Sequence, residues 1–314
     1  MVSMKSIFLK NFIKTVITII IIFSFSEVSS SQTADINSDK NIIGSLVIIG
    51  GIKRGILYEN VFSGSKKVSE LEWQLHNCWY TGISTEFTIM RKIALQADFA
   101  YGFNDETGSM SDSDWETTGE RYSYSSHSCE MDKALFVSIN SGWIFKPTAN
   151  IGLIPFLGFD AYSIGVSAHN GYIQLYSPYP TDQYGMVVLY RQKCIVPELG
   201  FMVDYEFYDV KLLLMTSYGR WGIARAIDNH YKTDVDYYDS INNIQKLEVG
   251  AVIDYNFSEK YFIRAKSSFT YIPSVRGSGY SVDTATGKKN KYGYGAIGIQ
   301  ISMLDIGLGT GIRF

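Results

Sequence analysis

Hydrophobic side chains recur at every second position over much of the chain. Between residues 247 and 257 the odd positions are apolar, and the even positions are polar or small, with Val252 the exception. Residues 261–271 and 304–314 repeat this alternation, and the last stretch ends on Phe314. Because successive side chains of a β-strand point to opposite faces, this pattern predicts strands with one apolar face and one polar face.

The arrangement of these segments predicts an all-β fold, a ten-stranded antiparallel transmembrane β-barrel with long extracellular loops. Soluble sandwiches also alternate. Here, however, charged side chains on the polar faces would pair across a lumen, and aromatic side chains lie near strand ends. The expected strands lie near 43–59, 69–84, 86–103, 132–146, 150–167, 187–204, 209–227, 243–257, 259–275 and 291–314. The expected short turns are 83–86, 146–150, 206–209 and 257–260, and the expected long loops are 60–68, 104–131, 168–186, 228–242 and 276–290. An amphipathic last strand ending in Phe resembles the assembly signal of bacterial outer-membrane barrels.

The first thirty residues have the pattern of an export signal. Three lysines precede the apolar run Val16–Phe25, and Val28 and Ser30 supply small residues for cleavage. We therefore expect residues 1–30 to be a signal peptide and residues 31–314 to be one barrel. Beyond the signal, no stretch approaches eighteen uninterrupted apolar residues, which argues against a helical membrane protein.

Composition agrees with an exported barrel and limits the possible partners. The chain has 314 residues, with 23 Tyr, 28 Gly and only 6 Pro, a balance that suits many strands. A net charge of −3 gives no electrostatic reason to expect a nucleic-acid partner. Three cysteines are too few for a disulfide framework, and an odd number leaves at least one thiol free or paired between chains.

Two short motifs carry candidate chemistry. Asp112 and Asp114 lie two residues apart, as do Asp228 and His230, so each pair shares one face of an extended segment. An Asp–His pair fixes the imidazole tautomer and raises its basicity, and paired carboxyls can share a proton and hold a polarised water. Across the mouth of a barrel the two pairs would allow water to attack a peptide bond directly. The plainer alternatives are a solvated acidic loop or weak cation site, and a surface Asp–His pair.

These motifs together resemble the omptin family of outer-membrane proteases over nearly the whole mature chain. The stretch Lys66–Trp73 is similar to the family's Lys-Val-Ser-x-Leu-x-Trp, Asp112–Trp115 to its Asp-x-Asp-Trp, and Asp228–Tyr231 to its Asp-x-His-Tyr. Ser217–Trp221 resembles a run that precedes the last motif. The resemblance implies an endopeptidase site in an extracellular cleft, with Asp112, Asp114, Asp228 and His230 catalytic. It also implies that Ser125 and His127 line the site.

The sequence also departs from the family's pattern. Gly55 and Ala226 stand where members that cleave after basic residues carry acidic side chains in the substrate pocket, and Glu59 could supply part of the missing charge. On the outer wall, Leu157, Phe159 and Ala161 replace charged contacts to lipopolysaccharide. Lys193, with Arg191 nearby, could keep one phosphate contact, so we expect a weaker or rearranged dependence on lipopolysaccharide.

We therefore predict an endopeptidase in the outer membrane of a Gram-negative bacterium, with its active site facing outside and peptides or proteins as substrates. The resemblance implies no metal and no cofactor, except lipopolysaccharide as an activator. A catalytically silent barrel that acts as an adhesin or invasin is the main alternative. A passive porin fits less well, because charged side chains would fill so narrow a barrel.

Overall fold

The computed structural model describes residues 42–104, 106–176 and 179–314, which form eleven β-strands. The expected signal peptide, residues 1–30, lies outside the described residues. Among those described, no helix is long and apolar enough to cross a membrane. The strands are β1 (Ile42–Ser63), β2 (Lys66–Ile89), β3 (Ile93–Phe103), β4 (Gly108–Trp115), β5 (Arg121–Trp143), β6 (Ile151–Leu175), β7 (Thr181–Phe207), β8 (Val210–His230), β9 (Val235–Asn256), β10 (Tyr261–Asp283) and β11 (Lys289–Arg313).

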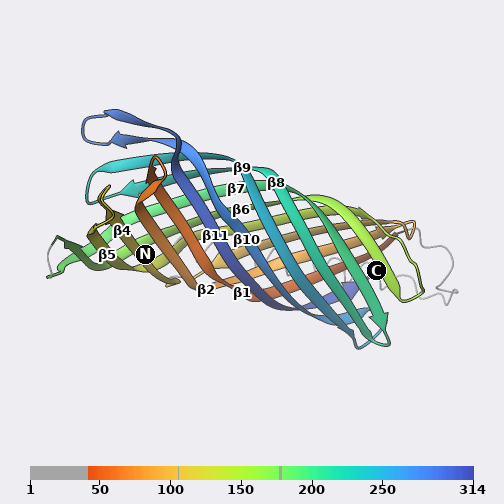
Figure 1. Cartoon of the computed structure of the whole chain (residues 1–314). Coiled ribbons are helices and arrows are strands. Elements are labelled where there is room, and N and C mark those ends of the chain that lie inside the picture. The colour runs from red at the N-terminus through yellow and green to blue at the C-terminus, as the bar shows by residue number, and fades with distance from the viewer. Residues whose placement is uncertain (1–41, 105, 177–178) are drawn as a thin grey trace. The chain divides into compact units, whose positions relative to one another are not determined.

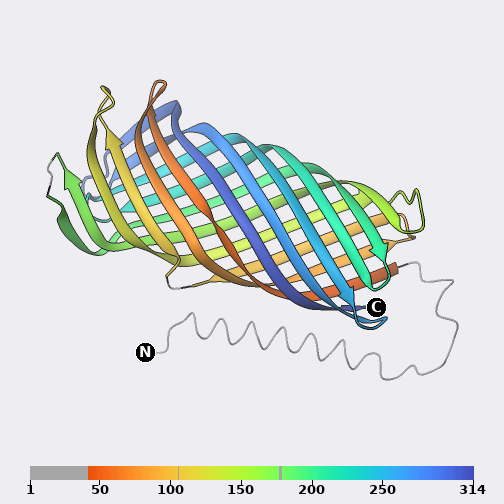
Figure 2. The ribbon, with the colours of Figure 1, turned by 60° about the horizontal axis from the view of Figure 1, so that its bottom comes forward.

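The strands close into an antiparallel ring. Strand β1 pairs with β2 on one side and with β11 on the other, so the first and last described strands are joined edge to edge. Strands β3 and β4 each pair with both β2 and β5 at different heights, so together they fill one position. The ring therefore has ten positions, as predicted, and its strands are steeply tilted (Figures 1 and 2).

The two ends of the ring differ, but not quite as expected. The hairpins between β1 and β2, β4 and β5, β6 and β7, β8 and β9, and β10 and β11 extend at the left-hand end of Figure 1. Most residues predicted as long loops belong to these strands; the segment 104–131, for example, contains β4 and the start of β5. The turn predicted at 83–86 is wrong, because these residues lie within β2 and the chain turns at residues 90–92.

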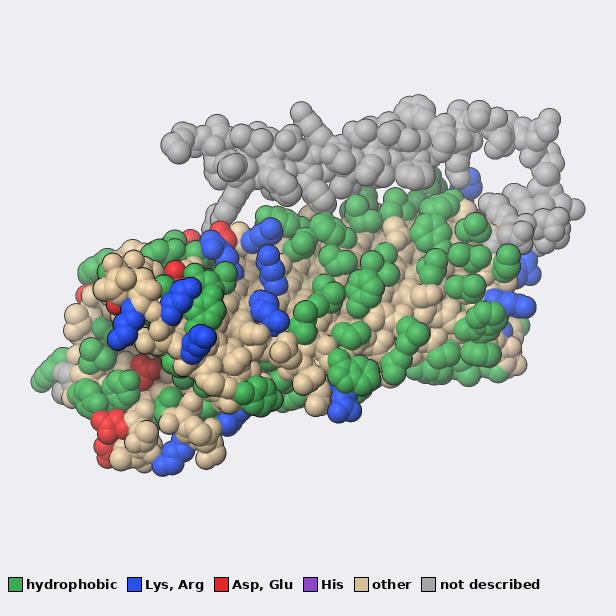
Figure 3. All heavy atoms as spheres, turned by 90° about the horizontal axis from the view of Figure 1, so that it is seen from above, with side chains coloured by type: hydrophobic (Ala, Val, Ile, Leu, Met, Phe, Trp, Pro, Cys, Tyr) green, Lys and Arg blue, Asp and Glu red, His purple; other side chains and the backbone are tan. Residues whose placement is uncertain are grey.

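The outer wall is apolar where the alternation predicted it. On β9, Leu247, Val249 and Ile253 are 47%, 46% and 47% exposed, whereas Lys246 and Asp254 are buried inside the ring. Figure 3 shows hydrophobic side chains spread over the wall towards the end with the short turns, with Lys and Arg side chains gathered at the edge of this cover. Lipid tails would contact this belt, because an outward-facing apolar band is what a bilayer requires.

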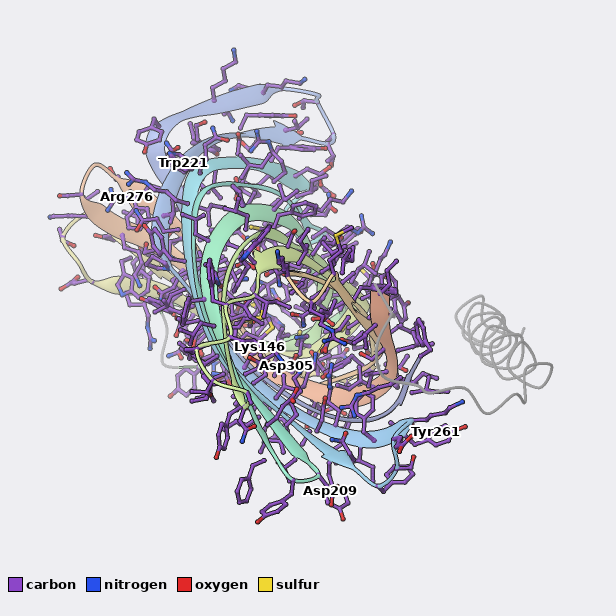
Figure 4. The ribbon with its side chains drawn as sticks, turned by 90° about the vertical axis from the view of Figure 1, so that its right-hand side faces the viewer. Lys146, Asp209, Trp221, Tyr261, Arg276 and Asp305 are labelled. Carbon is purple, nitrogen blue, oxygen red and sulfur yellow. The ribbon has the colours of Figure 1, made fainter. Side chains whose placement is uncertain are left out.

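Charged side chains fill the inside of the ring, as predicted, and form ion pairs both between neighbouring strands and between strands farther apart. Lys53 Nζ lies 2.8 Å from Asp305 Oδ2, and Arg264 makes two hydrogen bonds to Asp254, at 2.7 and 2.8 Å. Lys246 contacts three carboxylates at 2.6 to 3.1 Å. In Figure 4, Asp305 lies within the ring, while Asp209 and Tyr261 lie at its rim.

Candidate active site

An open cleft of about 600 Å³ lies between the hairpins. All four residues predicted to be catalytic line it, and so do Glu59 and Ser125. The rest of the lining is largely hydrophobic and aromatic, which limits the water that can screen charges in the cleft. These hydrophobic and aromatic residues include Val61, Leu71, Met110, Trp115, Tyr122, Tyr237 and Tyr292.

Asp228 and His230 stand at the end of β8, two positions apart, so their side chains share the face that points into the cleft. Asp228 is 2% exposed, and its Oδ2 lies 2.5 Å from Nε2 of His230. Since the N–H donates this bond, Nδ1 is the ring nitrogen left to accept a proton. The second oxygen of Asp228, Oδ1, is buried and has no hydrogen-bond partner among the described residues.

Opposing effects set the pKa of His230. Burial lowers it most of any single effect, but the charge and hydrogen bond of Asp228, together with the charges of Asp112 and Asp114, outweigh burial. The net result is a pKa above the ordinary value for histidine. The imidazole is therefore a stronger base than a free histidine side chain, as water activation requires.

Asp112 and Asp114 lie in β4 rather than in the loop predicted from the sequence. In the antiparallel register, Asp112 sits between Leu71 of β2 and Ser125 of β5. Burial, followed by the charges of Asp114 and Asp228, raises the pKa of Asp112 to about 7, although His230 opposes this shift. Asp112 Oδ1 is also buried, without a hydrogen-bond partner in the described part of the chain.

The structure brings the two pairs together across one cleft, although β5, β6 and β7 separate β4 from β8 in the ring. Their charges interact in both directions, because Asp112 raises the pKa of His230 and His230 lowers that of Asp112. A water held between them could pass a proton to the imidazole while the carboxyls hold its oxygen in place. Asp112, whose pKa is raised to about 7, titrates near neutral pH, where general acid–base catalysis is most effective.

Glu59 of β1 and Asp239 of β9 form a second acidic pair beside the first. Glu59 is 4% and Asp239 5% exposed, and their carboxyl groups lie within hydrogen-bonding reach of each other, which requires a shared proton. Burial, with the charge of Asp228, raises the pKa of Asp239 to about 7 and that of Glu59 well above its usual range.

Sequence reasoning did not find Asp239. It lies directly opposite Ala226 in the β8–β9 register, so it supplies a carboxyl group beside the position where the sequence lacks one. The sequence shows that Asp239 and Tyr237 are two positions apart and so share one face of a strand. It does not show which residues of β8 lie opposite them. Ala226 and Gly55 are absent from the described lining of the cleft. A Cβ on Gly55 would come within 2.2 Å of the Ser302 carbonyl oxygen, because β11 packs closely there.

Ser125 and His127 differ in their access to the cleft. Ser125 lines it opposite Asp112. His127 is buried, and its Nδ1–H donates to the Asn170 carbonyl oxygen at 2.6 Å. Burial lowers the pKa of His127, which keeps the ring neutral, and its Nε2 has no hydrogen-bond partner among the described residues.

Arg191 and Lys193 are exposed on β7, on the face opposite to the buried residues between and beside them. Lys193 stands directly opposite Arg225 of β8, and Arg191 Nε lies 3.7 Å from Asp132 Oδ2. Like charges directly opposite each other on a sheet are unfavourable unless an anion lies between them. Leu157 and Phe159 are exposed on the same wall.

The titratable side chains of the cleft do not form a metal site of the usual kind. Within residues 42–104, 106–176 and 179–314, no group of three or more His, Cys, Asp or Glu is arranged to hold a metal ion. No cysteine is among the described residues that line the cleft. The free thiols in the described part of the chain are all buried: Cys78, Cys129 and Cys194.

Known proteins resemble this chain in sequence and in fold. The sequence profile of the Omptin family matches residues 38–314. Outer membrane protease IcsP of Shigella flexneri is 22% identical over 229 residues, covering 68% of this chain and 71% of IcsP. Protease 7 of Escherichia coli strain K12 is 23% identical over 225 residues, covering 67% and 68% of the two chains. The crystal structure of outer membrane protease OmpT from Escherichia coli matches with a TM-score of 0.80 and 19% identity, covering 91% of this chain and 100% of that one.

Proposed function

The chain belongs to the omptin family of outer-membrane proteases, and we propose that it cleaves extracellular peptides or proteins by water attack between Asp228–His230 and Asp112–Asp114. One observation carries this assignment of residues. His230 contacts a buried carboxylate at 2.5 Å in a cleft that is also lined by Asp112 and Asp114. The arrangement supplies a base, a group that orients it, and acceptors for a water.

In the proposed reaction, Asp228 holds the imidazole and Nδ1 of His230 takes a proton from water. The water oxygen then bonds to the carbonyl carbon of the scissile peptide. Asp112 and Asp114 accept a hydrogen bond from the water and keep it in line with that carbon. The imidazolium afterwards returns its proton to the leaving nitrogen, and the C–N bond breaks. No acylated residue forms at any stage.

Single substitutions test these roles. His230→Ala, Asp112→Ala and Asp114→Ala should each abolish peptide cleavage, while the proteins should still migrate on gels as heat-modifiable folded barrels. His169→Ala is the matched control, because His169 bonds Ser167 at 3.0 Å and is outside the described lining of the cleft. Normal turnover by the His230→Ala protein would overturn the assignment.

The Glu59–Asp239 pair supports a preference for a basic residue before the scissile bond. A guanidinium or ammonium group entering this buried position would displace the shared proton and form charge-assisted bonds to both carboxylates. We therefore expect faster cleavage after Arg or Lys than after Leu in a mixed peptide set, mapped by mass spectrometry of the products. Asp239→Asn should reduce that selectivity, whereas equal rates for basic and neutral residues in the unsubstituted protein would contradict it.

The outer wall supports contact with lipopolysaccharide through Arg191 and Lys193. With Arg225 opposite Lys193, three cations lie where a phosphate group at the membrane surface would relieve their mutual repulsion. Added lipopolysaccharide should stimulate cleavage by detergent-refolded protein, and Lys193→Glu should weaken that stimulation. Equal activity with and without lipopolysaccharide would remove this part of the proposal.

A further inference from the structure

Hydrolysis in this cleft creates an electrostatic problem. When water attacks, the carbonyl oxygen of the substrate gains negative charge, and the surrounding carboxyl groups disfavour a further anion. His230 becomes a cation when it takes the water proton, but it is already bonded to Asp228. The site therefore needs a hydrogen-bond donor that carries no negative charge of its own. Four of these carboxyl groups line the cleft, namely Glu59, Asp112, Asp114 and Asp228, and Asp239 lies behind them, beside Glu59.

Tyr237 of β9 is placed to be that donor. It lies directly opposite Asp228 in the β8–β9 register, lines the cleft, and packs edge-on against the His230 ring with centroids 5.1 Å apart. It also stacks on Tyr292, with ring centroids 6.5 Å apart. These contacts hold the ring beside the imidazole that activates the water, so the phenol is fixed before substrate arrives, as an oxyanion donor must be.

The chemical state of Tyr237 suits this role. Burial, followed by the charges of Tyr292, Asp228, Asp112 and Glu59, raises the pKa of Tyr237 to about 12, so the phenol keeps its proton at neutral pH. A neutral O–H can donate to an oxyanion without repelling it, whereas an ionised group could not.

Other donors near the cleft have different partners. Lys232 Nζ donates to the Tyr184 carbonyl oxygen at 2.7 Å, and the Tyr292 hydroxyl pairs with the Ser281 hydroxyl at 2.9 Å. Tyr122 stacks on Tyr176, with centroids 5.3 Å apart. Tyr237 is thus set apart by its contact with the catalytic imidazole.

We propose that Tyr237 is a further catalytic residue, whose O–H donates a hydrogen bond to the scissile carbonyl oxygen as that oxygen becomes negative. This role rests on the function proposed above. The new C–O bond forms at the carbonyl carbon, the π electrons move onto the carbonyl oxygen, and the water proton goes to His230. Tyr237 keeps its proton throughout and only strengthens its hydrogen bond.

Tyr237→Phe tests this role, because it removes one oxygen atom and leaves the ring contacts with His230 and Tyr292. We expect kcat to fall by about 10²-fold or more, with KM within about twofold of the unsubstituted enzyme. A phosphinic peptide, whose tetrahedral anion mimics the attacked carbonyl, should lose affinity by a similar factor, since it imitates the transition state. The acidic limb of the pH–rate profile, which reports His230, should stay in place.

Tyr238→Phe is the matched control. Tyr238 is the next residue on β9 and stacks on Tyr280 at 4.8 Å, so the same chemical change is made on the opposite face of the strand. Gel migration of the folded form verifies that both variants are intact. Activity of Tyr237→Phe within about threefold of the unsubstituted enzyme, or a loss confined to KM, would overturn the proposal.

Two further outcomes are distinguishable. A shift of the acidic limb in Tyr237→Phe would show that the residue acts by positioning His230, and would also overturn a donor role. If the unsubstituted enzyme and His230→Ala cleave peptides equally, or if neither cleaves them, the proposed function itself fails and the role of Tyr237 fails with it.

Discussion

Replacing Asp228 with Asn tests the most closely defined contact of the site. The change keeps the size of the side chain but removes the charge that lies 2.5 Å from His230 Nε2. Burial lowers the pKa of His230, and Asp228 makes the largest of the contributions that raise it. The substitution therefore removes the main electrostatic support of the imidazolium and leaves the packing around it in place.

The size of the effect follows from two losses. A hydrogen bond to a charged group contributes about 1.5–3 kcal/mol, so weaker support of the imidazolium should slow the reaction by about 10- to 150-fold. In addition, an asparagine amide that donates to Nε2 would fix the proton on Nδ1, the nitrogen that must act as base. A mismatched tautomer of this kind costs about 10⁴-fold in a Ser-His-Asp triad. We therefore expect kcat/KM to fall by about 10²- to 10⁴-fold.

The assay is cleavage of a fluorogenic peptide from about pH 5 to about pH 9, a range that covers the titration of histidine. Removing the charge lowers the pKa of His230, and the base is active only when it is neutral. The acidic limb of the residual activity should therefore move to lower pH. Asp236→Asn is the control, because Asp236 accepts a bond from Asn229 at 2.8 Å on the same hairpin. Retention of more than about a tenth of the activity, with an unmoved acidic limb, would refute the reasoning.

Further predictions concern stability and reactivity. Burial raises the pKa of Asp112 to about 7, above about 3.9 in the unfolded chain, so its stabilising contribution is present at low pH and lost as pH rises through 7. Asp112→Asn should therefore raise the temperature of heat modification near pH 8 but not below about pH 4. Lys246→Met should leave three carboxylates unpaired and destabilise the barrel by about 3–5 kcal/mol, seen as a lower modification temperature. Lys266→Met should cost less, because Lys53 still holds Asp305 at 2.8 Å. The three thiols, those of Cys78, Cys129 and Cys194, are all buried. Iodoacetamide should therefore label them only after heating, and rapid labelling of the folded barrel would contradict this burial.

The barrel could be predicted from the sequence because lipid and lumen impose opposite demands on alternate residues. Leu247 and Val249 face outward while Lys246 is buried in an ion-pair cluster. Whether a residue is apolar or charged therefore indicates whether it faces lipid or the inside of the barrel. The same two-sided selection operates on β11, where Leu308 is exposed and Asp305 is buried. These patterns need only the local sequence, which explains why the ten positions of the ring were predictable.

The turns were harder to predict, because long-range partners can satisfy polar residues within a strand. Ser84 and Glu86 interrupt an apolar segment when only the sequence is read. In the structure both face inward, where Arg264 of β10 contacts Ser84 at 3.4 Å and Glu86 at 2.5 Å. The partner is 180 residues away from Ser84 in the chain. A polar run therefore indicates a turn only when no such partner exists, and local sequence does not contain that information.

The surroundings of the expected substrate pocket were hard to predict for a related reason. Reading Ala226 alone suggests that a carboxylate is missing, but residues directly opposite each other on antiparallel strands have Cβ atoms about 5 Å apart. Asp239 occupies the opposite position on β9 and places its carboxyl group beside Glu59. The charge available to a substrate depends on where carboxyl groups lie in the cleft, not on which strand carries them. A change at Ala226 should therefore be interpreted together with Asp239, since the two residues lie directly opposite each other on neighbouring strands.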